Sequence, residues 1–160
     1  MRQARLAAVG HPEVTGRHDK TLELTAEEAI TARASCVLGV AAGPLPGELP
    51  LLRGRVRLML AAGGWVDAVE GEVNPGYASA ERLIVRRSDQ ADPDTFLLGA
   101  SAAAADLDPR LLAALARPGA PVEVTVTELA PPAPVVLVLA PGTEAGPGIA
   151  RLAAQADLVV

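Results

Sequence analysis

The chain has 160 residues, half of them apolar, and its only aromatic side chains are Trp65, Tyr77 and Phe96. This length fits one ordinary domain, and its core must be aliphatic. A formal net charge of −5 gives no general attraction to phosphate backbones, and so few aromatic rings offer no stacking surface for bases, which argues against broad nucleic-acid binding.

Cysteine content and hydropathy predict the compartment. Cys36 is the only cysteine, so no intramolecular disulfide can form and a reducing, cytoplasmic location is expected. The N-terminal segment has no apolar run of signal-peptide length, and no segment approaches the roughly 20 apolar residues of a membrane-spanning helix. We therefore expect a soluble protein without a membrane partner.

The first half of the chain is predicted to form mainly strands. The alternation of apolar and polar residues, and short apolar runs, predict strands over residues 5–10, 21–25, 36–40, 55–60 and 65–73. Gly63-Gly64 lies between the last two strands and favours a hairpin. The segment from Thr25 to Glu28 combines a threonine cap with acidic residues and predicts one helical turn. Three prolines between Pro44 and Pro50 exclude a long helix there.

The second half contains the best helix signal. Strands are expected over residues 80–87, 95–101 and 122–127. Between the last two, Asp108 is a predicted N-cap, Pro109 occupies the first turn, and Pro118-Gly119 ends the helix. Leucines inside this helix form one apolar stripe. The fold class predicted from these elements is α+β, mostly β.

The two halves, about residues 1–62 and 65–130, follow the same order of elements. Leu22-Glu23-Leu24 aligns with Leu83-Ile84-Val85, and residues 38–41 align with residues 98–101. Neither half can cover its own apolar face, so we expect a duplicated strand-strand-strand-helix-strand unit packed about a pseudo-twofold axis into one barrel-like core.

A separate appendage is predicted from residue 131 to residue 160. It begins with the proline-rich segment 131–134, which is typical of an extended linker. The apolar run 135–139 predicts an edge strand, and residues 149–156 predict a short covering helix. The glycine-rich loop between them matches no nucleotide-binding pattern.

Several motifs give a resemblance to a known family. Gly10-His11-Pro12, the segment from His18 to Glu23, and Arg33 with Cys36 in the first half resemble the domain-of-unknown-function family 371 (DUF371). Gly64 and Asp67, Val85-x-Arg87-Ser88, and residues 105–108 extend the similarity to about residues 5–129. The resemblance implies a duplicated fold. It implies no activity, because the family has none assigned.

The chain departs from the family pattern at three places. Arg33-Ala34-Ser35-Cys36 stands where the family has Arg-Gly-Asp-Cys, so the acid is missing. Asn74 stands where the family has a second histidine, and residues 41–44 lack the charged residues of the family motif. The resemblance therefore does not carry over to this chain a family reaction that depends on that acid.

Both histidines, His11 and His18, lie in the connection between the strands predicted over residues 5–10 and 21–25. If these two strands pair, the histidines lie near the same end of the sheet. A cluster of imidazole, guanidinium and thiol groups can bind an anion, and a neutral histidine can act as a base. The preferred hypothesis is a ligand-binding or assembly module with an anion or phosphate site. His11 and His18 are the candidate catalytic residues, and Arg33, Cys36 and Thr21 are the candidate ligand contacts.

Other interpretations of these residues remain open. The chain is alternatively a nuclease-like or other phosphoester hydrolase, or a structural homo-oligomer formed through exposed strands. His11, His18 and Cys36 could bind zinc with Asp19 or Glu23 as a fourth ligand, although we predict no metal site, and no cofactor is assigned. In the plainest interpretation the histidines stabilise turns and Cys36 is a small buried hydrophobe.

The arginines of the strands predict a further feature. Five of them could form one basic face that would favour a phosphate-bearing or nucleic-acid ligand: Arg55, Arg57, Arg82, Arg86 and Arg87. Pairing with acidic neighbours explains them equally well. No cluster of carboxylates suited to magnesium accompanies them.

Overall fold

The computed structural model describes residues 2–130, 136–137 and 158–159. The chain divides into two units, Met1–Ala130 and Pro131–Val160, and each is described by itself. Within the described residues no helix has the length and apolar character needed to cross a membrane.

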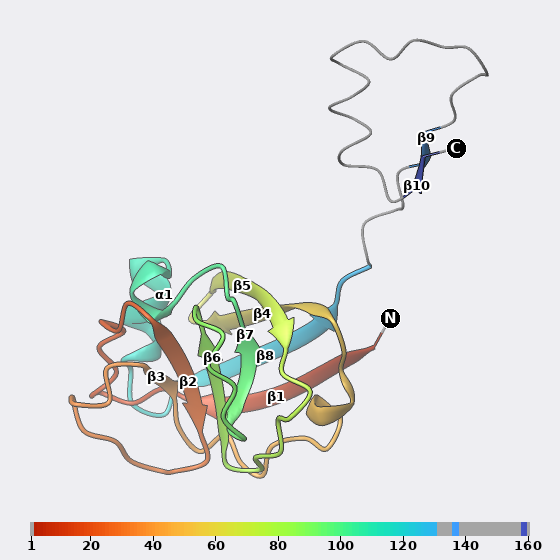
Figure 1. Cartoon of the computed structure of the whole chain (residues 1–160). Helices are drawn as coiled ribbons and strands as arrows, with labels where there is room; N and C mark the ends of the chain where they lie inside the picture. Colours follow the sequence, from red (N-terminus) through yellow and green to blue (C-terminus); the bar gives the residue numbers. More distant parts are fainter. Residues whose placement is uncertain (1, 131–135, 138–157, 160) are drawn as a thin grey trace. The chain divides into compact units, whose positions relative to one another are not determined.

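The first unit is a curved sheet with one α-helix, so the predicted α+β, mostly β class is confirmed (Figure 1). Its strands are β1 (Gln3–Val9), β2 (Thr21–Thr25), β3 (Val37–Gly39), β4 (Arg55–Ala62), β5 (Trp65–Val73), β6 (Arg82–Arg86), β7 (Thr95–Leu98) and β8 (Pro121–Glu128). The helices are α1 (Pro109–Leu115) and two 3-10 turns, η1 (Leu49–Leu51) and η2 (Ala104–Asp106). Each strand expected in this unit is present, and the bounds differ by a few residues.

The sheet is open, so the expected barrel is not closed. The strand order is β1-β8-β4-β5-β7-β6-β2-β3. Between the first and last strands the structure has one isolated bridge, in which Val9 and Val40 exchange backbone hydrogen bonds of 2.9 Å. Closure stops there because β3 has three residues and the backbone turns at Ala41, whose φ is 51°.

Of the strands that match between the two halves, β2 and β6 are neighbours in this sheet, as are β4 and β8, whereas β3 and β7 are not. β2 pairs antiparallel with β6, with Leu22 opposite Val85 and Leu24 opposite Leu83. β4 pairs antiparallel with β8 in the same manner. Antiparallel pairing of matched strands is what a local twofold axis would produce. Duplication of the unit itself stays a prediction.

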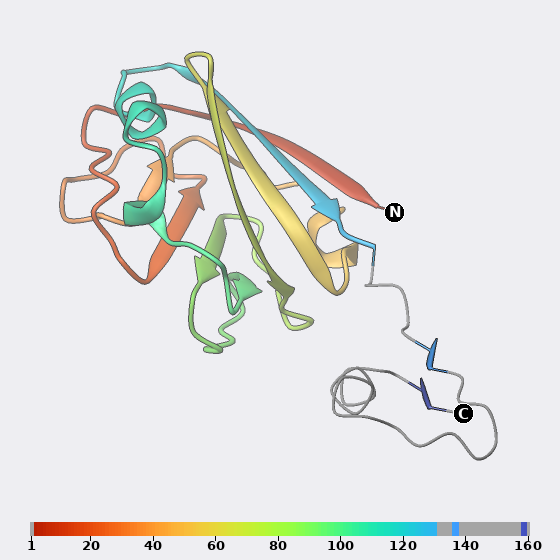
Figure 2. The same ribbon diagram turned by 90° about the horizontal axis from the view of Figure 1, so that it is seen from above.

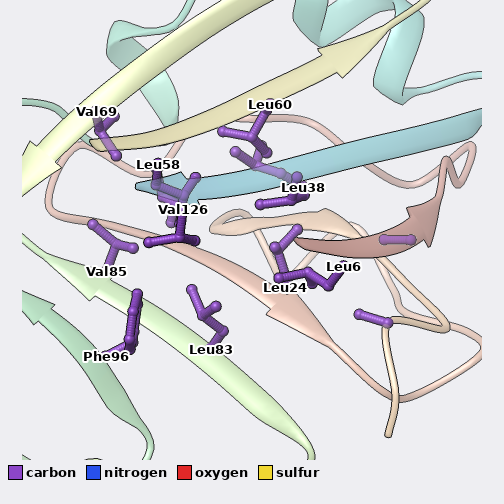
Figure 3. Close-up of a cluster of buried hydrophobic side chains, with 14 of the residues drawn as sticks. Leu6, Leu24, Leu38, Leu58, Leu60, Val69, Leu83, Val85, Phe96 and Val126 are labelled. Atoms are coloured by element: carbon purple, nitrogen blue, oxygen red, sulfur yellow. The ribbon is translucent and has the colours of Figure 1, made fainter. Parts of the chain in front are cut away.

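The core follows from the period of two along the strands. On β1, β4 and β8 every second side chain is buried, and the intervening ones face solvent. The buried side chains are almost all aliphatic, with Phe96 as the largest of those that are fully enclosed. Figure 3 shows buried side chains from several strands of the curved sheet, including Leu58, Leu83 and Phe96, gathered in one core cluster.

Helix α1 begins and ends as its sequence predicts. The Asp108 carboxylate accepts the backbone N–H of Arg110 at 2.9 Å, and Pro109 occupies the first helical position. Leu111 and Leu115 are buried. They bring the helix against β3, β4 and β5, at one end of the sheet (Figure 2).

The expected helical turn at Thr25 is wrong. The Thr25 hydroxyl does accept the backbone N–H of Glu27, at 3.2 Å, but no helix follows. The carbonyls of Thr25 and Glu27 accept instead from Ala42 and Ala41. These carbonyls point toward a distant segment of the chain, so the backbone does not take the helical path that would offer them to the i+4 amides.

Little of the predicted appendage falls within the described residues. β9 (Val136–Leu137) lies in the expected strand and pairs in parallel with β10 (Leu158–Val159). The expected linker 131–134 and helix 149–156 lie outside the described residues.

Candidate functional site

The loop before β2 holds His18 by its own backbone. His18 Nδ1 accepts the backbone N–H of Thr21 at 3.0 Å and that of Lys20 at 3.2 Å, and it lies 3.1 Å from the Thr21 hydroxyl. A nitrogen that accepts these bonds carries no proton, so the neutral ring carries its proton on Nε2. Nε2 is therefore the nitrogen left for a ligand, and it is a donor. This tautomer suits contact with an anion better than the role of a general base.

Hydrogen bonds tie this loop to three other segments. The His18 backbone N–H donates to the Ser35 carbonyl at 3.3 Å, and the His18 carbonyl accepts from Ala105 of η2 at 3.0 Å. The Lys20 carbonyl accepts from the backbone N–H of Arg87, also at 3.0 Å. The loop is thereby fixed beside the end of β6, which lies more than sixty residues further along the chain.

A pocket of about 590 Å³ lies between these two segments. Its size is that of a small-molecule site. We call it the basic pocket, and its lining residues are His18, Asp19, Lys20, Thr21, Arg86, Arg87, Ser88 and Gln90. The lining brings together the His18–Thr21 and Arg87-Ser88 motifs, which come from different halves of the chain.

The cations of the basic pocket are held in different ways. Arg86 donates from Nε to the Thr95 hydroxyl at 2.9 Å and pairs through Nη2 with Asp92 at 3.2 Å. Arg87 pairs through Nη1 with Asp106 at 3.0 Å. Each guanidinium keeps donors that these bonds do not use. No carboxylate in the described part of the chain lies within ion-pair distance of the Lys20 ammonium.

His11 lies in another turn and does not line the basic pocket. Its Nδ1 accepts the backbone N–H of Glu13 at 3.1 Å, and its own backbone N–H donates to the Leu115 carbonyl at the end of α1. These bonds join the connection after β1 to the helix. The side chain of His11 thus has a visible structural role.

Arg33 also lies outside the basic pocket. It is exposed on the turn before β3, and within residues 2–130 its side chain makes no hydrogen bond or ion pair. The structure therefore brings His18 and Thr21 together, and it does not add His11 or Arg33 to them.

Cys36 contacts a carboxylate, and this pair lies next to the loop of His18. Cys36 Sγ donates to Glu23 Oε2 at 3.5 Å, and Arg82 Nε lies 3.7 Å from the other carboxylate oxygen of Glu23. Burial raises the pKa of the Glu23 carboxyl. Burial, and then the charge and hydrogen bond of Glu23, raise the pKa of the Cys36 thiol. A thiol held protonated is a poor nucleophile, so this site does not favour thiol catalysis.

The zinc alternative finds no support in the geometry. Across the described ranges, no three side chains of histidine, cysteine, aspartate or glutamate gather closely enough to hold a metal ion. His11, His18 and Cys36 therefore do not form a ligand set.

The predicted basic face consists of paired arginines. Arg55 and Arg57 both lie beside Glu70, and Arg82 lies beside Glu23 and Glu27. Arg86 and Arg87 pair with the aspartates given above. The acidic neighbours thus offset most of this charge, and exposed pairs of this kind contribute little to stability.

The sequence predicted Arg86 and Arg87 as part of a basic face, but not that they meet the loop of His18 in one pocket. Thr21 is opposite Arg86 in the β2–β6 ladder, and this register places Lys20 beside Arg87. The family motif at Arg87-Ser88 was the available signal, but its distance from His18 in the sequence concealed that the two segments meet.

Comparison with known protein families gives a match over most of the chain. The family model described as Domain of unknown function (DUF371) matches residues 6–129, which is nearly the whole first unit. No curated protein matches the chain.

Proposed function

Since the chain belongs to the DUF371 family, whose description names no activity, we propose a function from the basic pocket: the protein binds a small phosphate-bearing ligand there. The observation that carries this proposal is the meeting of the His18–Thr21 loop with the Arg86–Gln90 segment around one cavity. Their backbone hydrogen bond between Arg87 and Lys20 fixes the two segments beside each other.

The donors of the pocket suit a tetrahedral anion. Nε2 of His18 and the unused guanidinium nitrogens of Arg86 and Arg87 supply directed N–H groups, and Lys20 supplies a mobile positive charge. The Ser88 hydroxyl accepts the backbone N–H of Gln90 at 3.4 Å, so its own proton stays free to donate. Asp19 is the one acid in the lining, and it limits the charge that the pocket can attract.

Binding of inorganic phosphate tests the proposal. The amide resonances of the full chain, followed by NMR during a phosphate titration at constant ionic strength, should shift for residues 18–21 and 86–90. Lys20→Gln and Arg87→Gln should each weaken binding by about fivefold or more, because each removes a charged hydrogen bond worth about 1.5–3 kcal/mol in favourable geometry and less at a wet surface.

Arg33→Gln is the matched control. It makes the same charge change on an exposed turn outside the pocket, so it should leave phosphate affinity unchanged. Equal losses in the Arg33 and Arg87 variants would show that only overall charge matters. An absence of saturable phosphate binding would sink the proposal. The assembly role and the homo-oligomer stay predictions.

A further inference from the structure

A second pocket adjoins the basic pocket. It has a volume of about 690 Å³ and shares Arg86 with the first. We call it the side pocket, and it is lined by Ala78, Ser79, Arg82, Ile84, Arg86, Asp92, Pro93 and Asp94. The two pockets therefore meet at Arg86, and a ligand that fills both would pass along this side chain.

The strand β6 sets the floor of this extension. Leu83 and Val85 are fully buried in the core, so the alternating residues Arg82, Ile84 and Arg86 lie on the opposite face. Ile84 is 9 % exposed and gives a small apolar surface between two guanidinium groups. Arg86 stands at the boundary and is fixed by Thr95 and Asp92.

The side pocket offers donors and acceptors in balance. Its two arginines, Arg82 and Arg86, are matched by two carboxylates, Asp92 and Asp94. The Ser79 hydroxyl accepts the backbone N–H groups of Glu81 and Arg82 at 3.2 and 3.0 Å, which leaves its proton free. Within residues 2–130 the carboxylate of Asp94 accepts no hydrogen bond from a protein donor, and it lies in the lining as an open acceptor.

This chemistry selects a neutral, hydroxyl-bearing group. A balanced lining does not favour a second ionised group, since either sign would meet a like charge. Hydroxyls can donate to Asp94 and accept from Ser79 or Arg82 at the same time. No aromatic ring is present in the lining to stack a base. From the adjoining pockets we infer that the ligand is a phosphorylated polyhydroxy compound of the sugar phosphate class, with its phosphate at the basic pocket and its hydroxyls in the side pocket.

This inference rests on the proposed function, and the test separates the two. The full chain is titrated with methyl phosphate, glycerol 3-phosphate, ribose 5-phosphate and glucose 6-phosphate. All four carry a phosphate monoester, so differences report the hydroxylated part. At least one polyhydroxy ester should bind about fivefold or more tightly than methyl phosphate, as expected for at least one added hydrogen bond. It should also shift the amides of Ser79, Ile84 and Asp94.

Asp94→Asn is the variant that addresses the side pocket alone. It removes the charged acceptor and keeps the shape, so it should reduce the advantage of the best polyhydroxy ester at least threefold and leave methyl phosphate affinity unchanged. Glu72→Gln, on an exposed position of β5, is the charge control and should change neither. Equal affinities of all four esters would overturn this inference and leave phosphate binding intact. No binding of any ester would overturn both.

Discussion

His11 and Asn74 perform the same task in two matching turns. His11 Nδ1 accepts the backbone N–H of Glu13 at 3.1 Å, and Asn74 Oδ1 accepts the backbone N–H of Gly76 at 3.0 Å. In each turn the carbonyl of the same residue accepts a second N–H three residues later, at 3.0 Å in both cases. In both side chains the accepting atom is bonded to Cγ. The turns differ in burial, because Asn74 is 5 % exposed and His11 is half-buried.

His11→Asn should therefore be nearly neutral. Oδ1 of the new side chain can accept the Glu13 N–H where Nδ1 does now. His11→Ala removes the acceptor and should lower the free energy of unfolding by about 1 kcal/mol, the usual contribution of one such hydrogen bond. Urea unfolding of both variants measures this. If the asparagine variant were as unstable as the alanine variant, the ring itself would be the stabilising element.

The reverse exchange, Asn74→His, should be strongly destabilising. The Asn74 amide donates to the carbonyls of Thr95 and Asp92 at 2.9 and 3.1 Å. A histidine ring that keeps its Nδ1 at the acceptor position has a C–H where this amide has its NH2, and the ring is larger than the buried space. Lost pairing and overpacking together should lower the free energy of unfolding by about 2–4 kcal/mol. Urea unfolding of Asn74→His and His11→Asn under the same conditions measures both changes in the free energy of unfolding. Equal changes would contradict the prediction, because they would mean that both turns accommodate either side chain equally well.

The fold was largely predictable because local signals agree with the tertiary structure. The alternation in β4 and β5, the Gly63-Gly64 turn and the Asp108 cap each act within a few residues, so the sequence pattern is enough to find them. The helical turn predicted at Thr25 does not form, because the Thr25 carbonyl accepts the backbone N–H of Ala42. No local sequence pattern reports this contact. The predicted barrel is not closed for a similar reason, since closure depends on how many residues of β3 pair with β1, which no local pattern reports.

Of the two segments that line the basic pocket, only the one from His18 to Thr21 was predicted as part of the histidine site. His18 and Thr21 are neighbours in sequence, and their polar character in an apolar chain marked them. Arg86 and Ser88 enter the pocket through the β2–β6 register, which becomes known only when the strands are paired. The sequence does not distinguish His11 and Arg33 from His18, but His11 lies in the turn against α1 and Arg33 is exposed on the turn before β3.

Glu23 should make stability fall as pH rises. Burial raises the pKa of its carboxyl above the ordinary 4.5, so between 4.5 and the raised value the native state keeps a proton that the unfolded chain has lost. Stability then decreases through that window. Glu23→Gln cannot titrate, so its free energy of unfolding should gain relative to the native sequence between pH 4.5 and neutrality. Urea unfolding across this range measures the difference.

Glu128 should change the free energy of unfolding with pH in the opposite direction to Glu23, so it serves as the comparison. The backbone N–H groups of Arg2 and Arg53 donate to its carboxylate and lower its pKa. Its stabilisation is present above the ordinary pKa and is lost as pH falls through the lowered one. Glu128→Gln should therefore lose stability relative to the native sequence as pH rises. Parallel behaviour of the Glu23 and Glu128 variants would contradict the assignment of burial as the main effect on Glu23.

Cys36 should react slowly with alkylating reagents. Only the thiolate attacks iodoacetamide, and burial followed by the neighbouring Glu23 raises the pKa of this thiol. At pH 8 the folded chain should be alkylated more slowly than the same chain in urea, and Glu23→Gln should increase the folded rate because it removes the negative charge and the carboxylate acceptor. The rate measured against pH separates charge from access: removal of the charge moves the midpoint of the profile to lower pH, whereas better access raises the plateau alone. A fast native reaction, or a midpoint that Glu23→Gln leaves in place, would show that the carboxylate does not hold the thiol in its protonated form.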